Sequence, residues 1–243
     1  MITIAMIPAR YAATRFPFKL MQALGNKTVI RQTYDNTVAT GLFNEVIVVT
    51  DSQIIFDEIT GHGGKAIMST NQHESGSDRI AEAVAEIDAD VILNVQGDEP
   101  FIKKEALHKL VLSFKDETVQ VASLMKVFKD IELVKNPNYV KVVVDKKNNS
   151  LLFTRSVIPF NRDNVTTPVY YEHIGVYAFR KAALLQFTSW QPTPLEMAEK
   201  IECLRYLENG IALRMVLTDT DNVKIDVPED LAKANAYLSA LKN

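Results

Sequence analysis

The first 115 residues alternate between short apolar runs and segments with helical periodicity, and this alternation limits the fold more than any other feature. The apolar runs cover residues 2–7, 45–50, 65–68 and 89–97. The helical pattern covers residues 28–40, 53–60, 78–87 and 103–114. Strands that alternate with helices join into parallel βαβ units. The pattern therefore predicts an α/β protein with a Rossmann-like order and a mostly parallel central sheet.

The rhythm changes after Val119. Strand-like runs follow one another with few helical segments between them, at residues 120–127, 139–145, 151–155 and 173–179. This spacing predicts an antiparallel region, residues 119–191, inserted into a single domain that spans residues 1–243. Pro159 and Pro168 mark an exposed connection inside it, suited to substrate contacts or to a dimer interface. A helix from Pro194 to Gly210, strands at 213–217 and 223–226, and a helix at 228–241 complete the prediction.

Composition excludes several classes of protein. The chain has 243 residues, 47% hydrophobic and 23% charged, with a formal net charge of −3, so nothing indicates a nucleic-acid surface. Its single cysteine, Cys203, cannot form an intrachain disulfide and favours a reducing compartment. No stretch reaches the roughly 18 to 20 apolar residues that a membrane span needs. We expect a soluble, cytoplasmic protein that binds small molecules or copies of itself.

A cationic loop follows the first apolar run. Arg10, Arg15 and Lys19 lie between and beside Pro8 and Pro17, which disfavour a helix because proline lacks an amide donor. A loop at the carboxyl end of a central strand is where α/β proteins bind ligands. Guanidinium and ammonium groups at that place indicate an anion, most simply a polyphosphate, although a solvated basic loop would show the same pattern.

Two further segments are expected near that loop. Ser75, Gly76 and Asp78 open a helix, where they serve as a cap or let a ligand approach bare amides. Asp98 follows Gln96 at the end of the next buried run, where a carboxylate can hold a divalent cation on phosphates or simply form a polar turn.

A third segment carries the other carboxylate. Asp226-Val227-Pro228-Glu229 fits a capping box for the last helix, and its aspartate follows a strand-like run. Together, the cationic loop, the helix entrance and the two aspartates favour metal-assisted chemistry on a nucleoside triphosphate. A dinucleotide oxidoreductase is disfavoured, because the pattern at 61–66 follows a helix and precedes a strand.

Seven motifs, in order along nearly the whole chain, resemble the 3-deoxy-manno-octulosonate cytidylyltransferases, the CMP-Kdo synthetases. They are Pro8-Ala9-Arg10-Tyr11 with Thr14-Arg15 and Lys19; His73-x-Ser75-Gly76-Ser77-x-Arg79; Gln96-Gly97-Asp98-Glu99-Pro100; Asn136-Pro137-Asn138 with Val140-Lys141-Val142; His173-Ile174-Gly175-Val176-Tyr177; Trp190-Gln191-Pro192-Thr193-Pro194-Leu195-Glu196; and Asp226-x-Pro228-Glu229-Asp230-Leu231. The resemblance implies a nucleotidyltransferase fold and a magnesium-dependent homodimer.

The resemblance also implies a reaction and its residues. Such an enzyme transfers CMP from CTP to the anomeric hydroxyl of Kdo, an eight-carbon acid sugar, and releases pyrophosphate for lipopolysaccharide biosynthesis. The positions that match the phosphate and cytidine sites are Arg10, Arg15, Lys19, Ser75, Gly76, Arg79 and Gln96. Asp98 and Asp226 match the Mg²⁺ ligands and, with Lys19, form the catalytic group. The positions that match the sugar-acid site are Arg155, His173, Tyr177 and Gln191.

The cationic loop departs from the family's usual Ser-Thr-Arg-x-Pro-Gly-Lys-Pro-Leu. Ala13 replaces the serine, Phe18 the glycine and Leu20 a proline. Losing the glycine matters if that residue has a positive φ or lies against phosphate. Two alternatives stay open beside the Kdo enzyme: a cytidylyltransferase for 8-amino-Kdo or a sialic acid, and a non-catalytic nucleotide-binding module.

Overall fold

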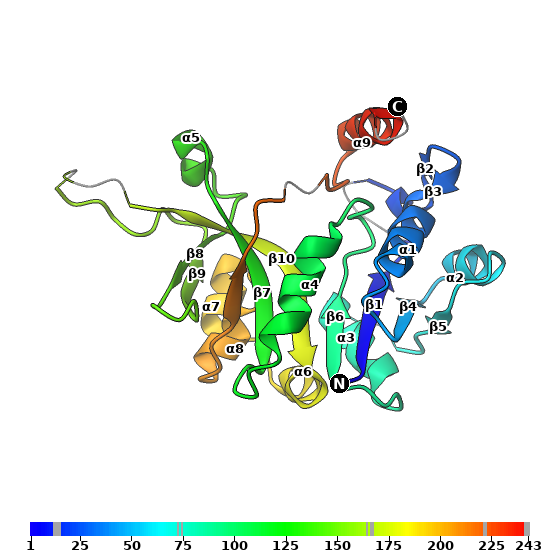
Figure 1. The fold of residues 1–243 in the computed structure, drawn as a ribbon, viewed down its shortest axis with the longest axis horizontal. Helices are drawn as coiled ribbons and strands as arrows, with labels where there is room; N and C mark the ends of the chain where they lie inside the picture. The colour runs from blue at the N-terminus through cyan, green and yellow to red at the C-terminus, as the bar shows by residue number, and fades with distance from the viewer. Residues whose placement is uncertain are drawn as a thin grey trace. The chain divides into compact units, whose positions relative to one another are not determined.

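A computed structural model describes residues 1–11, 16–71, 73, 75–163, 165, 168–220 and 223–240. The chain forms two compact units. The first contains Met1–His108 and Asp221–Asn243, and the second contains Lys109–Thr220 (Figure 1). The second unit therefore includes the 119–191 region and extends beyond it on both sides.

The first unit is built on four parallel strands. β1 (Thr3–Ala9) pairs with both β4 (Glu45–Thr50) and β6 (Val91–Asn94), and β4 pairs with β5 (Ala66–Met68). The strand order β6-β1-β4-β5 is that of a βαβ sheet, and β1 is buried along almost its whole length. The predicted parallel α/β sheet is confirmed.

Helices and short elements complete the first unit. Its helices are α1 (Val29–Ala39), α2 (Gln53–Thr60), α3 (Gly76–Val84) and α9 (Pro228–Ala240), while α4 (Lys104–Ser113) crosses its boundary. A 3₁₀ turn, η1 (Lys19–Met21), precedes the small hairpin β2 (Ala23–Leu24) and β3 (Lys27–Thr28). Thr28 caps α1 by accepting from the backbone N–H of Arg31 at 3.2 Å.

The second unit is mainly antiparallel. β10 (Tyr171–Arg180) runs antiparallel to β7 (Val121–Val127) and to β8 (Lys141–Val144), and β8 runs antiparallel to β9 (Ser150–Thr154). β11 (Arg214–Leu217), by contrast, is parallel to its neighbour, β7. The helices of this unit are α5 (Ile131–Lys135), α6 (Lys181–Ser189), α7 (Pro194–Glu199) and α8 (Leu204–Glu208). The predicted antiparallel region is thus present, with short helices added.

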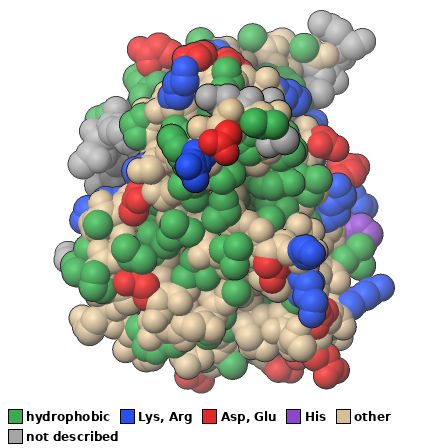
Figure 2. Space-filling view, turned by 90° about the vertical axis from the view of Figure 1, so that its left-hand side faces the viewer, with side chains coloured by type: hydrophobic (Ala, Val, Ile, Leu, Met, Phe, Trp, Pro, Cys, Tyr) green, Lys and Arg blue, Asp and Glu red, His purple; other side chains and the backbone are tan. Residues whose placement is uncertain are grey.

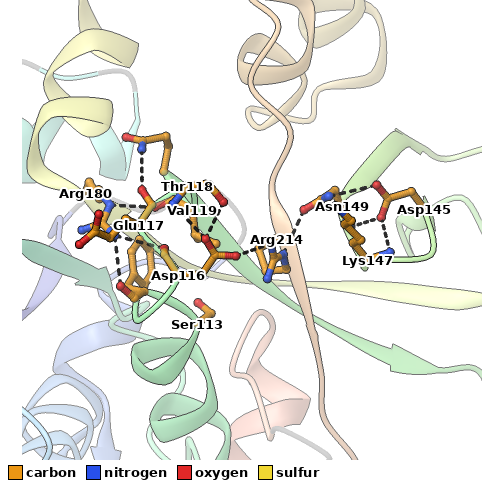
Figure 3. A network of polar contacts seen from close by, with 12 residues as sticks. Ser113, Asp116, Glu117, Thr118, Val119, Asp145, Lys147, Asn149, Arg180 and Arg214 are labelled. Carbon is orange, nitrogen blue, oxygen red and sulfur yellow. Dashed lines mark hydrogen bonds and ion pairs between the residues drawn. The ribbon is translucent and has the colours of Figure 1, made fainter.

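A polar network joins β11 to two turns of the second unit (Figure 3). Arg214 Nε donates to Asn149 Oδ1 at 3.0 Å, and Arg214 Nη2 donates to Asp116 Oδ2 at 3.1 Å. On the other side of Asn149, Asp145 accepts from the backbone N–H groups of Lys147 and Asn149, at 2.7 and 2.8 Å. We name Asp116, Asp145, Asn149 and Arg214 the Arg214 network. Its charges are satisfied by one another and by the backbone.

Two predicted elements are wrong. The helix predicted from Pro194 to Gly210 breaks into α7 and α8 at Lys200, which has φ 54°. Beside the break, the Glu196 carboxylate binds Arg205, and the Glu199 carboxylate accepts from Thr154 Oγ1 and from the Arg155 N–H. The strand predicted at 223–226 is absent, and Ile225 instead donates its N–H to the backbone oxygen of Asp98 at 3.0 Å.

Candidate active site

A pocket in the first unit collects most of the residues expected to bind a nucleotide. Its lining residues are Pro8, Ala9, Arg10, His73, Ser75, Gly76, Arg79 and Gln96. They come from the carboxyl end of β1, from the entrance and first turn of α3, and from the segment after β6. The carboxyl ends of parallel strands meet at one sheet edge, which is where α/β proteins bind ligands.

The entrance of α3 forms one wall of this pocket. Ser75 Oγ accepts from the backbone N–H of Asp78 at 3.1 Å and donates to Asp78 Oδ2 at 2.8 Å, so the capping pair predicted from the sequence is confirmed. A Cβ atom on Gly76 would lie only 3.0 Å from Pro8 Cγ. Any larger residue would press against Pro8, and with glycine here the start of the helix is left without a covering side chain.

Arg79 gives the pocket a buried positive charge. The residue is 5% exposed, and its Nη2 donates to Asp51 Oδ2 at 2.7 Å. Its Nη1 is buried and has no hydrogen-bond partner within the part of the chain that the structure describes. An unpartnered buried guanidinium nitrogen is costly, so an oxygen acceptor on a bound ligand would stabilise it.

The second part of the site is an ion cluster of Lys19, Asp98, Asp226 and Lys224, which we name the Lys19 cluster. Lys19 Nζ forms a short ion pair with Asp98 Oδ2, donates to the Ile225 carbonyl oxygen at 3.1 Å, and lies 3.4 Å from Asp226 Oδ1. Lys224 Nζ lies 3.5 Å from Asp226 Oδ2. The cluster therefore joins η1, the segment after β6 and the segment before α9.

Two details of this cluster favour binding over local structure. At the start of α9, Asp230 Oδ2 accepts from the backbone N–H groups of Asp226 and Val227 at 3.1 and 3.2 Å. The carboxylate of Asp226 forms ion pairs with Lys19 and Lys224. Burial would lower the pKa of Lys224, but Asp98, Asp226 and Glu99 outweigh it and raise the pKa. Negative charge thus dominates this spot.

The donor set agrees with the type of magnesium site expected from the sequence. Mg²⁺ is usually held by one or two carboxylates together with substrate phosphates and water, and Lys19 brings Asp98 and Asp226 to a single point. No group of three or more His, Cys, Asp or Glu side chains suited to a metal occurs among the described residues. The protein's two carboxylates would therefore need phosphate oxygens to complete the ion's coordination.

Phe18 shows the backbone shape of the cationic loop. Its φ of 57° and ψ of 25° lie in the left-handed region, and its ring lies 4.5 Å from that of Tyr11 between centroids. The position thus keeps a conformation that favours glycine, although it carries a bulky side chain. Arg15 and Ala13 lie outside the described residues.

The four residues expected at the sugar acid, Arg155, His173, Tyr177 and Gln191, all belong to the second unit. Arg155 donates to the Glu199 and Pro137 carbonyl oxygens at 2.7 and 2.8 Å, and Gln191 is exposed. The rings of His173 and Tyr177 lie 5.4 Å apart between centroids. The structure therefore brings His173 and Tyr177 together, and it holds the Arg155 side chain on backbone oxygens.

Burial sets the proton state of two of these side chains. His173 is 9% exposed and its Nε2 lies 2.9 Å from Ser123 Oγ. Burial lowers the pKa of His173 to about 3, so its ring is neutral at pH 7. Burial also raises the pKa of Tyr177 well above its ordinary value, and the neighbouring Cys203 adds to this effect. Both side chains are therefore uncharged hydrogen-bonding groups.

Sequence reasoning missed Lys224 and Glu82, and it assigned no role to His73 by itself. Lys224 lies two positions before Asp226, so a search for cations beside the predicted metal ligands would have found it. Glu82 gives no such signal, because it lies in an ordinary amphipathic helix. Its importance comes only from contacts with a preceding segment of the chain.

No helix in the described part of the chain is long and apolar enough to cross a bilayer. The pattern of the cytidylyltransferase family matches residues 4–225. A 3-deoxy-manno-octulosonate cytidylyltransferase of Flavobacterium johnsoniae is 55% identical, with 97% of this chain and 98% of the relative covered. One of Christiangramia forsetii is 53% identical, with 97% and 96% covered.

A solved structure has a similar fold. It is a CMP:2-keto-3-deoxy-manno-octonic acid synthetase in complex with CTP, with a TM-score of 0.94 and 32% identity, and it matches 99% of this chain and 100% of its own. Identity of this degree over the whole length is evidence of common descent as well as of a common fold. This chain therefore belongs to the 3-deoxy-manno-octulosonate cytidylyltransferase family.

Proposed function

We propose that this chain transfers CMP from CTP to the anomeric hydroxyl of Kdo and releases pyrophosphate. The observation that carries the proposal is the Lys19 cluster, in which one ammonium joins two carboxylates from distant parts of the sequence. It accompanies a pocket with a buried, partly unpartnered arginine in the same unit. Membership of the family supplies the identity of the nucleotide and the sugar.

In this mechanism the first unit holds the triphosphate. Arg10 and Lys19 bind phosphate oxygens, and Arg79 and Gln96 orient the cytidine with the bare helix start at Ser75–Gly76. Asp98 and Asp226 would hold Mg²⁺, which would neutralise phosphate charge and lower the pKa of the attacking hydroxyl. The sugar oxygen forms a bond to the α-phosphorus as the bond to pyrophosphate breaks, and the hydroxyl proton passes to solvent.

The second unit supplies the sugar-acid contacts in this proposal. The neutral His173 ring and the Tyr177 hydroxyl offer uncharged hydrogen-bonding groups, suited to the hydroxyls of a sugar. Arg155 and Gln191 are the remaining candidates, and the Arg155 guanidinium is the group suited to the carboxylate. We propose that the whole chain, 1–243, works as one nucleotidyltransferase domain with 119–191 as its inserted sugar-binding region.

We also propose that the enzyme is a homodimer that acts in the cytoplasm and supplies lipopolysaccharide biosynthesis. Large apolar side chains are exposed on the second unit, and hydrophobic groups are spread over the face seen in Figure 2. Among them, Phe160 is 84% exposed, Val165 83% and Leu151 61%. Exposed apolar side chains in such number suit a subunit interface.

Light scattering after gel filtration tests the dimer. The wild type should elute as a dimer, and Phe160→Asp should shift it toward the monomer because a charge would be buried at the interface. Val38→Asp is the matched control, since Val38 is a 48% exposed side chain on α1 of the other unit. A monomeric wild type, or equal effects of both substitutions, would contradict the proposal.

The central experiment measures pyrophosphate release with Mg²⁺ for CTP, UTP and ATP, each offered with Kdo, 8-amino-Kdo and a sialic acid. Release with CTP and Kdo above all other pairs is the expected result. A preference for 8-amino-Kdo or sialic acid would keep the chemistry and reassign the sugar. CTP binding without turnover on any acid sugar would instead identify a non-catalytic nucleotide-binding module.

A further inference from the structure

The residues between β5 and α3 converge on a single carboxylate, that of Glu82 on the second turn of α3. Ser69 Oγ donates to Glu82 Oε2 at 2.6 Å, and Asn71 Nδ2 donates to Oε1 at 3.0 Å. Thr70 donates to Oε1 twice, from its N–H at 3.1 Å and from its hydroxyl at 2.5 Å. His73 Nε2 lies 2.5 Å from Oε2. Five contacts from four residues exceed what an ordinary surface glutamate makes.

These contacts require an ionised carboxylate. A carboxylate accepts through about four lone-pair sites, so the ring, amide and hydroxyl donors saturate both oxygens. Burial alone would raise the pKa of Glu82, but hydrogen bonds from Ser69, Thr70 and His73 outweigh it and lower the pKa. Glu82 is therefore negatively charged at pH 7.

The position of Glu82 on α3 explains its reach. It lies seven residues after Ser75, the N-cap of the helix. Residues seven apart lie on the same side of an α-helix, two turns from each other. The Glu82 carboxylate thus contacts side chains from Ser69 to His73, just before the pocket wall formed by Ser75 and Gly76.

The contact with His73 also fixes a tautomer. A carboxylate oxygen can only accept, so the Nε2 atom of His73 carries the hydrogen. The other ring nitrogen, Nδ1, is then the group that remains for other contacts, and His73 is one of the residues that line the pocket. Carboxylates orient functional histidines in this way when they bind the far ring nitrogen.

We propose that Glu82 is a positioning residue for the nucleotide site: its carboxylate fixes the ring and tautomer of His73 and fastens Ser69, Thr70 and Asn71 beside the entrance of α3. It does not line the pocket itself. The inference rests on the proposed binding of CTP in this pocket. It therefore predicts an effect on nucleotide affinity, with the chemical step at the Lys19 cluster left intact.

The kinetic test compares three variants. Glu82→Ala should raise KM for CTP by about 10-fold to 100-fold, with kcat within about 2-fold of wild type, as is usual for residues that orient a ligand's direct contacts. Glu82→Gln keeps one acceptor oxygen, so its KM for CTP should lie between that of the wild type and that of Glu82→Ala. Glu86→Ala removes an exposed carboxylate one turn further along and should match wild type. A Glu82→Ala enzyme with wild-type KM would overturn the proposal.

A second readout separates positioning from simple stabilisation. Nitrogen-15 NMR of the imidazoles, with the His73 signals assigned from a His73→Asn variant, should show a hydrogen on Nε2 in the wild type. The signal should move toward a tautomer mixture in Glu82→Gln, which also tests the idea if Glu82→Ala does not fold. A lower Tm with unchanged His73 signals and unchanged CTP affinity would show that Glu82 only stabilises the fold.

These readouts also separate this inference from the proposed function. If wild-type enzyme binds CTP by calorimetry but releases no pyrophosphate with any acid sugar, the proposed reaction fails while Glu82 is still tested by CTP affinity. If the wild type turns over and Glu82→Ala binds CTP equally well, only the role of Glu82 fails.

Discussion

The Lys19 cluster of the first unit and the Arg214 network of the second contain similar charged groups but arrange them differently. In the Arg214 network each charge meets a partner of matching geometry, such as Arg214 Nη2 with Asp116 or the backbone amides with Asp145. In the Lys19 cluster one ammonium is shared by two carboxylates and a carbonyl oxygen. The first arrangement fastens turns, whereas the second gathers two carboxylates from distant parts of the sequence around one ammonium group.

The difference indicates how to separate binding charges from structural ones. A pocket also lies beside the Arg214 network, lined in part by Asp116, Lys147, Asn149 and Arg214. Its main charges already satisfy each other, so the pocket by itself does not favour a ligand. In the first unit, the Nη1 atom of Arg79 is buried without a partner among the described residues, and carboxylates are held together at like charge. Such costs persist where a ligand offsets them.

The strongest test makes the same change in both clusters. Asp98→Asn should lower kcat/KM by about 10²-fold to 10³-fold, because it removes an electrostatic group used in the transition state. Asp116→Asn, its counterpart in the Arg214 network, should leave kcat/KM near the wild-type value. Steady-state pyrophosphate release measures kcat/KM of both variants, with circular dichroism as a folding control. A near-normal rate for Asp98→Asn would show that Asp98 is only a polar turn residue.

The next effect concerns the buried His173 of the second unit. Its pKa is about 3 when folded and 6.5 in the reference state, so the unfolded chain binds more protons between these values. Stability is then fully present above pH 6.5 and is lost as pH falls toward 3, by about 2 kcal/mol between pH 7 and pH 5.

Urea unfolding of wild type and His173→Asn at pH 7 and pH 5 checks this. The variant should be less stable at pH 7, but its stability should fall by about 2 kcal/mol less between the two pH values. Equal slopes for the two proteins would mean that His173 is solvated or already charged in the native state.

Phe18 tests the shape of the cationic loop. Phe18→Gly and Phe18→Ala both remove the ring contact with Tyr11, but only alanine keeps a Cβ at φ 57°. The glycine variant should therefore be more stable than the alanine variant by about 1 kcal/mol. At an exposed position with an ordinary backbone, the alanine variant would be the more stable one. Denaturant midpoints measure the difference, and an alanine variant that is equally stable or more stable would exclude a left-handed residue here.

The smallest effect is expected in the Arg214 network. Hydrogen bonds from Thr118 and then Arg214 lower the pKa of Asp116, so its contribution to stability is present above the unfolded pKa and lost as pH falls through the folded value. Asp116→Asn should lower the urea midpoint slightly at pH 7 and by less at pH 3. A larger loss in acid than at neutral pH would contradict this sign.

Much of the fold was predictable because the signals are local. β4 and α2 match their predicted bounds. Predictions failed where distant side chains decide the backbone. Beside the break at Lys200, Glu196 contacts Arg205 and Glu199 contacts Thr154 of β9. The segment before α9 hydrogen-bonds to the Asp98 carbonyl oxygen and forms no strand.

For the candidate site, the sequence by itself determined which residue types follow each strand, because apolar periodicity places strand ends and proline and glycine place turns. It could not decide which of those residues meet. The partners Lys19, Asp98 and Asp226 are 79 and 207 positions apart, and only the tertiary structure brings them to one ammonium group. The same holds for Glu82, whose role depends on side chains that a helical pattern does not encode. Contacts between distant residues follow from chain topology and packing, which local propensity does not contain.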